Sequence, residues 1–161
     1  MIICCDIDGV LADVREYVVK YLPHDWKTFF SHTPDAAIVP AMRTMIRAMH
    51  LSSELYFVTG RPESNREQTV RWLAEEVMYS VYFSYSTRLL MRPNNDSRLT
   101  CEIKMEWFRE LRPDLVIDDD PAVVKAATKA GFIVLQVHGF RITDEDMVPT
   151  NYLEEEECSN P

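Results

Sequence analysis

Short apolar runs alternate with longer amphipathic segments along most of this chain. The first run begins at Ile2 and ends in two carboxylates, Asp6 and Asp8, and a turn glycine follows at once. Such short, nearly continuous apolar runs are typical of buried strands in a parallel sheet. Further strands are predicted at 54–58, 81–83, 89–91, 114–117 and 132–137. Helices are predicted from apolar residues at helical spacing, at 11–22, 37–50, 63–76, 100–111 and 122–130.

Strands that alternate with helices in this way predict βαβ units, and therefore an α/β fold with a parallel sheet in a three-layer α/β/α sandwich. The 161 residues suffice for one domain with a substantial core. No apolar run approaches transmembrane length, and the apolar start lacks the basic residues and cleavage site of a signal peptide. We therefore expect a cytoplasmic protein that does not bind a membrane.

The net charge of −9 is unevenly distributed. Residues 141–161 hold seven acidic side chains and one basic one, which leaves nineteen acidic against sixteen basic side chains before them. The segment 141–161 is predicted to be a flexible acidic tail, because blocks of like charge stay solvated. The remaining chain is close to neutral, so the acidity argues only weakly against a nucleic-acid substrate.

Three predicted strands end in polar turns. The residues in these turns are Asp6 and Asp8, Thr59 and Arg61, and Asp118 and Asp119. Taken singly, each turn has an ordinary explanation: a solvated D-x-D-G turn, a weak T-G-R match, and acidic capping of a helix that begins at Pro121. However, the carboxyl ends of parallel strands meet at one edge of a sheet, where ligands bind. Because all three polar turns fall at carboxyl ends of predicted strands, together they favour a metal-dependent phosphate site.

These residues resemble the motifs of the haloacid dehalogenase (HAD) phosphohydrolase superfamily. The first motif corresponds to the segment from Asp6 to Val10, the second to Thr59, the third to Lys104 and the fourth to Asp118 and Asp119. The resemblance implies a Rossmann-like, HAD-like fold, a Mg²⁺ cofactor and an aspartyl-phosphate intermediate. A lysine on an amphipathic helix is ordinarily a solvated residue, so the role of Lys104 depends on the other motifs.

The resemblance assigns each motif residue a role. Asp6 is the expected nucleophile, and Asp8 is the expected general acid and base, two residues along the chain. Mg²⁺ prefers one or two carboxylates together with water and substrate oxygens. The expected metal ligands are Asp6, the backbone carbonyl of Asp8, Asp118, and Asp119 directly or through water. Thr59 and Lys104 are expected to donate to the phosphoryl oxygens, and Lys104 also to keep Asp6 ionised.

A narrower resemblance concerns the substrate. The segment from Asp96 to Arg98, followed by Lys104, and the turn Thr59-Gly60-Arg61 look like the 3′-phosphatase domain of phage-type polynucleotide kinase–phosphatases. In that subfamily the two arginines contact the substrate, and guanidinium suits phosphate. This implies substrate binding by Gly60, Arg61 and Arg98. The sequence has no G-x-x-x-x-G-K-[ST] loop, so only phosphatase activity is expected.

The predicted domain spans residues 1–140, with a small cap at 23–35. The expected partner is a phosphomonoester, either a nucleotide or a nucleic-acid 3′ end, and no obligate protein partner is evident. The leading hypothesis is a polynucleotide 3′-phosphatase. The first alternative is a 5′-nucleotidase on free (deoxy)mononucleotides, in which Trp26, Phe29 or Phe30 stacks on the base, and the cap length is similar to that of deoxyribonucleotidases. The second alternative is a catalytically idle HAD domain that binds phosphorylated ligands or a protein.

Overall fold

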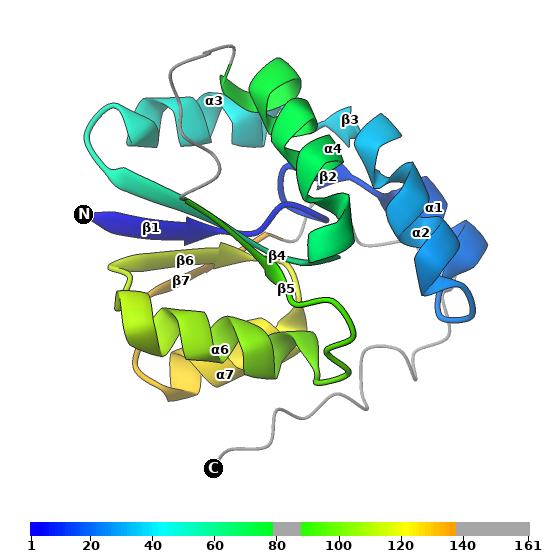
Figure 1. Cartoon of the computed structure of the whole chain (residues 1–161). Coiled ribbons are helices and arrows are strands. Elements are labelled where there is room, and N and C mark those ends of the chain that lie inside the picture. Colours follow the sequence, from blue (N-terminus) through cyan, green and yellow to red (C-terminus); the bar gives the residue numbers. More distant parts are fainter. Residues whose placement is uncertain (79–87, 138–161) are drawn as a thin grey trace.

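The protein is built around one parallel sheet. The computed structural model describes residues 1–78 and 88–137, and Figure 1 shows the sheet as the middle layer. The strand order is β5-β4-β1-β6-β7, and every neighbouring pair is parallel. The strands are β1 (Ile2–Cys5), β4 (Glu54–Pro62), β5 (Leu89–Arg92), β6 (Leu115–Asp118) and β7 (Val134–Gln136). Because β1 has β4 on one side and β6 on the other, the chain reverses its winding direction at β1, which places a binding site at its carboxyl end.

Helices cover both faces of this sheet (Figure 1). One face carries α3 (Pro40–His50), η2 (Glu63–Asn65), α4 (Arg66–Trp72) and the π-helical turn η3 (Leu73–Met78), and the other carries α6 (Thr100–Leu111) and α7 (Pro121–Lys129). The two faces have separate apolar cores. Cys5 belongs to the first and Cys4 to the second, as the alternation of side chains along a strand requires. The structure confirms the predicted three-layer α/β/α sandwich.

A small helical excursion lies beyond the carboxyl ends of the strands (Figure 1). It contains β2 (Ala12–Asp13), α1 (Arg15–Tyr21), α2 (Trp26–His32), η1 (Thr33–Asp35) and β3 (Ala37–Ile38). The two short strands pair antiparallel and close the excursion at its base. The rings of Tyr17 and Tyr21 stack on His32, which joins α1 to α2. The excursion is therefore a compact unit beside the strand ends.

Several predicted boundaries were wrong for local reasons. The helix predicted at 11–22 begins only at Arg15, because Leu11 and Ala12 are buried and Ala12 pairs with Ile38. The helix predicted at 37–50 begins at Pro40, because proline suits the first helical position. Strand β4 continues four residues past the predicted end, and the helix predicted at 63–76 is divided into η2, α4 and η3.

Two predicted segments, the strand at 81–83 and the acidic tail at 141–161, lie outside the described residues. Within the part of the chain that the structure describes, no helix is long and apolar enough to cross a membrane.

Candidate active site

The register of β1 and β6 brings two of the predicted carboxylates together. Cys5 pairs with Ile117, and the Asp6 backbone N–H continues the ladder by donating to the Ile117 carbonyl over 2.9 Å. Asp118 is the next residue of β6, so the two aspartates leave neighbouring strands side by side. Both side chains are buried. The predicted pairing of the first and fourth motifs is therefore a direct result of strand register.

Lys104 lies between these two carboxylates. Its Nζ is 3.0 Å from Asp6 Oδ1 and 2.7 Å from Asp118 Oδ2, and its side chain is only 2% exposed. It reaches this position because it lies on the buried stripe of α6, three residues after Cys101 and four before Phe108. Burial alone would lower the pKa of Lys104, but the carboxylates of Asp118 and Asp6 outweigh this effect and raise it. The lysine is thus held as a buried cation.

Asp119 completes an acidic cluster next to the β1 turn. Gly9 has a φ of +81°, and a Cβ at this position would lie 2.0 Å from Asp119 Oδ2. Only glycine allows this turn and this approach together. One carboxylate oxygen from each of Asp6, Asp118 and Asp119 lies within 4.8 Å of the other two.

These three carboxylates suit a divalent cation. Burial raises the pKa of Asp6 and of Asp118, and burial followed by the charge of Asp118 raises the pKa of Asp119 to about 7. When all three are ionised, the ammonium of Lys104 leaves two negative charges uncompensated in a buried setting. Oxygen ligands of this kind are those that Mg²⁺ prefers, and a bound cation removes the repulsion.

Asp8 lies apart from this cluster and is held by Arg61. The guanidinium donates from Nε to Asp8 Oδ2 over 2.9 Å and from Nη2 to Oδ1 over 2.6 Å. Arg61 is fully buried, and its third nitrogen, Nη1, donates to Thr69 Oγ1. Its guanidinium also lies over the ring of Trp72. This bidentate contact fixes the orientation of the Asp8 carboxylate.

Thr59 and Gly60 lie where the pairing of β4 with β5 is irregular. Thr59 pairs with Met91, but the next paired residue is Pro62, with Arg92, so Gly60 and Arg61 bulge out of the ladder. Thr59 is buried, and its Oγ1 accepts from the Arg61 backbone N–H over 3.2 Å. Bulges commonly redirect side chains beside active sites, and this bulge turns Arg61 toward Asp8.

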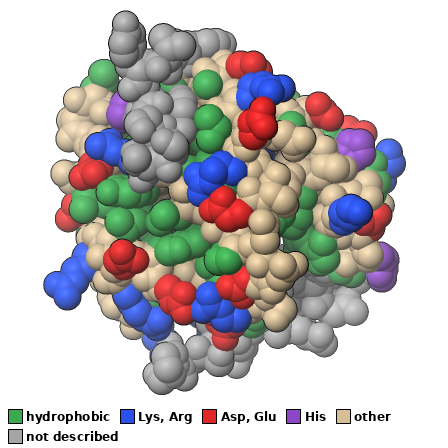
Figure 2. Space-filling model, viewed as in Figure 1, with side chains coloured by type: hydrophobic (Ala, Val, Ile, Leu, Met, Phe, Trp, Pro, Cys, Tyr) green, Lys and Arg blue, Asp and Glu red, His purple; other side chains and the backbone are tan. Residues whose placement is uncertain are grey.

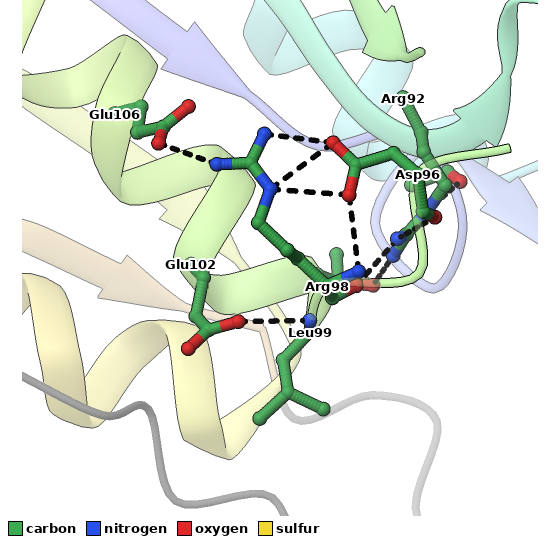
Figure 3. Close-up of polar contacts among 8 residues, drawn as sticks. Arg92, Asp96, Arg98, Leu99, Glu102 and Glu106 are labelled. Atoms are coloured by element: carbon green, nitrogen blue, oxygen red, sulfur yellow. Dashed lines mark hydrogen bonds and ion pairs between the residues drawn. The ribbon is translucent and has the colours of Figure 1, made fainter. Parts of the chain in front are cut away.

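Arg98 occupies a different environment from the other predicted residues. Its guanidinium lies between Asp96, at 2.7 Å, and Glu106, at 2.5 Å, and the side chain is 44% exposed (Figure 3). The structure thus brings Arg98 into an exposed ion-pair cluster, and substrate contact by Arg98 stays a prediction. On the face drawn in Figure 2, acidic and basic side chains are interspersed.

Residues 1–139 match a family described as the polynucleotide kinase PNKP phosphatase domain. The chain belongs to this family. The match confirms the resemblance inferred from the motif residues, to the HAD superfamily and within it to this phosphatase domain.

This chain, called a PNKP-type domain below because of its family, is also similar to individual proteins. It is 32% identical over 98 residues to the "Putative nucleotidase OB0422" of Oceanobacillus iheyensis, an alignment that covers 59% of this chain and 46% of that protein. The chain thus spans about half the length of this curated relative. A chain in the structure of the Pnkp1/Rnl/Hen1 RNA repair complex has a TM-score of 0.65 at 24% identity, over 84% of this chain and 41% of that chain. The Class C acid phosphatase from Bacillus anthracis has a TM-score of 0.56 at 16% identity, over 83% of this chain and 65% of that chain. At these identities the solved structures show the shared fold alone.

Three residues around the site of this PNKP-type domain were not predicted from the sequence. Thr69 accepts from Arg61, and Arg92 and Thr100 contact one another beside the Thr59 bulge. Arg92 directly follows the apolar run at 89–91, just as Asp6 and Asp118 follow apolar runs, and this position was its only sequence signal. Asp120, the third aspartate of the turn that begins at Asp118, caps α7, because its Oδ1 accepts from the Ala122 N–H.

Proposed function

We propose that this PNKP-type domain is a Mg²⁺-dependent phosphomonoesterase that removes the 3′ phosphate from nucleic-acid ends through an aspartyl-phosphate on Asp6. The catalytic domain comprises residues 1–140, with the excursion around 23–35 as a small cap. The observation that carries the proposal is the carboxylate cluster at the strand ends, in which buried Asp6 and Asp118 flank Lys104 and the half-buried Asp119 lies close to both carboxylates. A fold seldom keeps an excess of buried negative charge unless a cation or a reaction uses it.

The site residues fit binding of the metal and of the phosphoryl group. Asp6, Asp118 and the backbone carbonyl of Asp8 would hold Mg²⁺, and Asp119 would bind it directly or through water. The bound cation supplies positive charge that lets an anionic nucleophile approach an anionic phosphate. Lys104 adds a fixed positive charge beside Asp6, and the hydroxyl of Thr59 donates to a phosphoryl oxygen.

The first step transfers the phosphoryl group to Asp6. A carboxylate oxygen of Asp6 attacks phosphorus, and the bond from phosphorus to the ester oxygen breaks. Asp8 acts here in its protonated form, with one oxygen released from Arg61, and gives its proton to that leaving oxygen, which departs as the 3′ hydroxyl. Lys104 favours the ionised form of Asp6 that the attack requires.

The second step releases inorganic phosphate. Water attacks phosphorus while Asp8, now a carboxylate, takes one of the water protons, and the bond between phosphorus and the Asp6 oxygen breaks. Both Asp8 oxygens accept from Arg61, which fixes the carboxylate for this role as a base. Arg61 is therefore a positioning residue that acts through Asp8.

The family match supports the preference for a 3′ end. Residues 1–139 match the PNKP phosphatase domain, and the motif residues resemble a 3′-phosphatase domain. The test compares phosphate release from a 3′-phosphorylated oligonucleotide and from 3′- and 5′-mononucleotides, each with Mg²⁺ and with a chelator. We expect Mg²⁺-dependent release with a preference for the oligonucleotide. A chain that is inactive on the oligonucleotide would contradict the proposal.

A 5′-nucleotidase is the second candidate, because the relative from Oceanobacillus iheyensis carries the word nucleotidase in its name. The excursion offers aromatic rings for a base, with Trp26 46% exposed and its ring 5.7 Å from that of Phe30. In this case mononucleotides are the better substrates, and Trp26→Ala raises their KM. If neither substrate class is hydrolysed, the chain is an idle binding domain.

A further inference from the structure

Arg92, the last residue of β5, joins three segments that converge on the site. Its guanidinium donates from Nε to the Gly60 carbonyl over 3.2 Å and from Nη2 to Thr100 Oγ1 over 2.7 Å. Nη1 donates to the carbonyls of Asp96 and Arg98, at 3.1 and 2.6 Å (Figure 3). The half-buried side chain thus contacts the end of β4, the loop after β5 and the first residue of α6.

The contact with Gly60 supports an irregular part of the sheet. Because β4 bulges between Thr59 and Pro62, the ladder with β5 is interrupted at Gly60. Arg92 supplies a side-chain donor at this point. Gly60 joins Thr59, the proposed phosphate donor, to Arg61, which holds Asp8. A shift of this bulge would therefore move two site residues together.

The contact with Thr100 acts on the other side of the site. Thr100 and Lys104 are four residues apart on α6 and so lie on the same face, one turn from each other. A Cβ on Gly60 would lie 3.2 Å from the Thr100 side chain, so the bulge and the helix are already in close contact. Thr59, Gly60, Arg92, Thr100 and Lys104 border the same small hollow between the bulge and the helix.

We infer that Arg92 is a positioning residue that sets the distance between the Thr59 bulge and Lys104, and so holds two phosphate-binding donors in register. This inference rests on the proposed phosphatase function for its kinetic consequence. The planar guanidinium is essential to this role, because its three nitrogens donate to acceptors from different segments. A lysine keeps the charge but has a single nitrogen on a flexible stem.

The test uses Arg92→Lys with Arg66→Lys as the matched control. Arg66 is also half-buried and, like Arg92, donates to a backbone carbonyl, that of Leu89. It pairs in addition with Glu63, and among the described residues its hydrogen bonds reach no site residue. Steady-state kinetics are measured on a small aryl phosphomonoester and on a 3′-phosphorylated oligonucleotide. For Arg92→Lys we expect kcat to fall about 10- to 100-fold on both, with KM nearly unchanged, because misplaced groups lose rate rather than binding. Thr100→Val, which removes one acceptor, is expected to act in the same direction with a smaller loss.

Hydrogen exchange provides a readout that does not need activity. In Arg92→Lys, amides of residues 59–61 and of the first turn of α6 should exchange faster, whereas Arg66→Lys should leave them unchanged. Unchanged exchange in these segments, or an unchanged kcat, overturns the inference. A KM increase confined to the oligonucleotide, with kcat intact, also overturns it and makes Arg92 a substrate contact. If the wild-type chain hydrolyses neither substrate, the proposed function fails, and the exchange result alone decides whether Arg92 holds the two segments.

Discussion

Two ion-pair clusters in this protein have similar contact distances but different surroundings. In the buried cluster, Lys104 lies 3.0 and 2.7 Å from Asp6 and Asp118, and the three side chains are at most 7% exposed. In the exposed cluster, Arg98 lies 2.7 and 2.5 Å from Asp96 and Glu106, with side chains 13–56% exposed. Distance alone does not distinguish the two clusters.

The degree of solvent exposure determines the energetic role of each cluster. Exposed ion pairs contribute little to stability, because water and salt screen them. In the buried cluster, desolvation is costly and each charge depends on its partners, so the pKa values of Asp6 and Asp118 are raised even though Lys104 lies beside them. The buried cluster is thus suited to bind a cation, whereas the exposed one is suited to fix the loop before α6.

The largest expected effect comes from replacing the nucleophile in the buried cluster. Asp6→Asn should lower kcat on the oligonucleotide by about 10³-fold or more, because the amide cannot form the acyl phosphate. Circular dichroism should show an intact fold. The same change in the exposed cluster, Asp96→Asn, is the control and should retain most of the activity. Retained turnover in Asp6→Asn would place the nucleophile elsewhere.

The next effect concerns stability. Lys104→Met should lower the free energy of unfolding by about 3–5 kcal/mol, because it leaves buried carboxylates without their cation. Urea denaturation of the chelator-treated protein measures it. Adding Asp118→Asn to Lys104→Met should recover part of the loss, since one of the unpaired charges disappears. Equal stabilities of the single and double variants would show that Asp118 carries no uncompensated charge once Lys104 is replaced, which would contradict the prediction.

A smaller effect on stability is expected at Asp119, where a substitution should stabilise the metal-free protein instead of destabilising it. Its pKa in the folded protein is about 7, above the ordinary value of 3.8, so the folded state binds more protons between these values. Stability of the chelator-treated protein should therefore fall as pH rises from about 4 to 7, and Asp119→Asn should remove part of this fall.

Thermal melts at pH 8 provide the measurement. We expect Asp119→Asn to melt about 2–4 °C higher than wild type without metal and to gain less from added Mg²⁺. A variant that melts lower without metal would contradict the repulsion inferred at Asp119, and one that gains as much from Mg²⁺ as wild type does would exclude Asp119 from the cation site.

The smallest stability effect is expected in the exposed cluster. Arg98→Ala should leave the melting temperature within a degree or two of wild type, because its charged partners remain hydrated. If Arg98 exchanges its carboxylate partners for substrate phosphate, the variant should raise KM for the oligonucleotide and leave kcat nearly unchanged. Glu106→Gln, which removes one competing carboxylate, should lower that KM. An unchanged kcat/KM in both variants would remove Arg98 from the site.

The sequence located most of the buried cluster but explained little of the exposed one. Asp6 and Asp118 were predictable because each follows an apolar run directly, where a charge needs a function. The partners of Arg61 and Arg98 were not predictable in the same way. Arg61 looked like a substrate ligand, yet it is buried against Asp8 through a bulge that has no clear sequence signal.

The sequence by itself determined the alternation of strands and helices, the acidic turns and the family, because these depend on local periodicity and on residue types at fixed spacing. Only the tertiary structure decided which charges meet. The register of β1 with β6 brings Asp6 beside Asp118, the orientation of α6 brings Lys104 to both, and the guanidinium of Arg92 joins segments up to 40 residues apart. Such contacts depend on packing between distant segments, and burial then determines how strongly the charges interact.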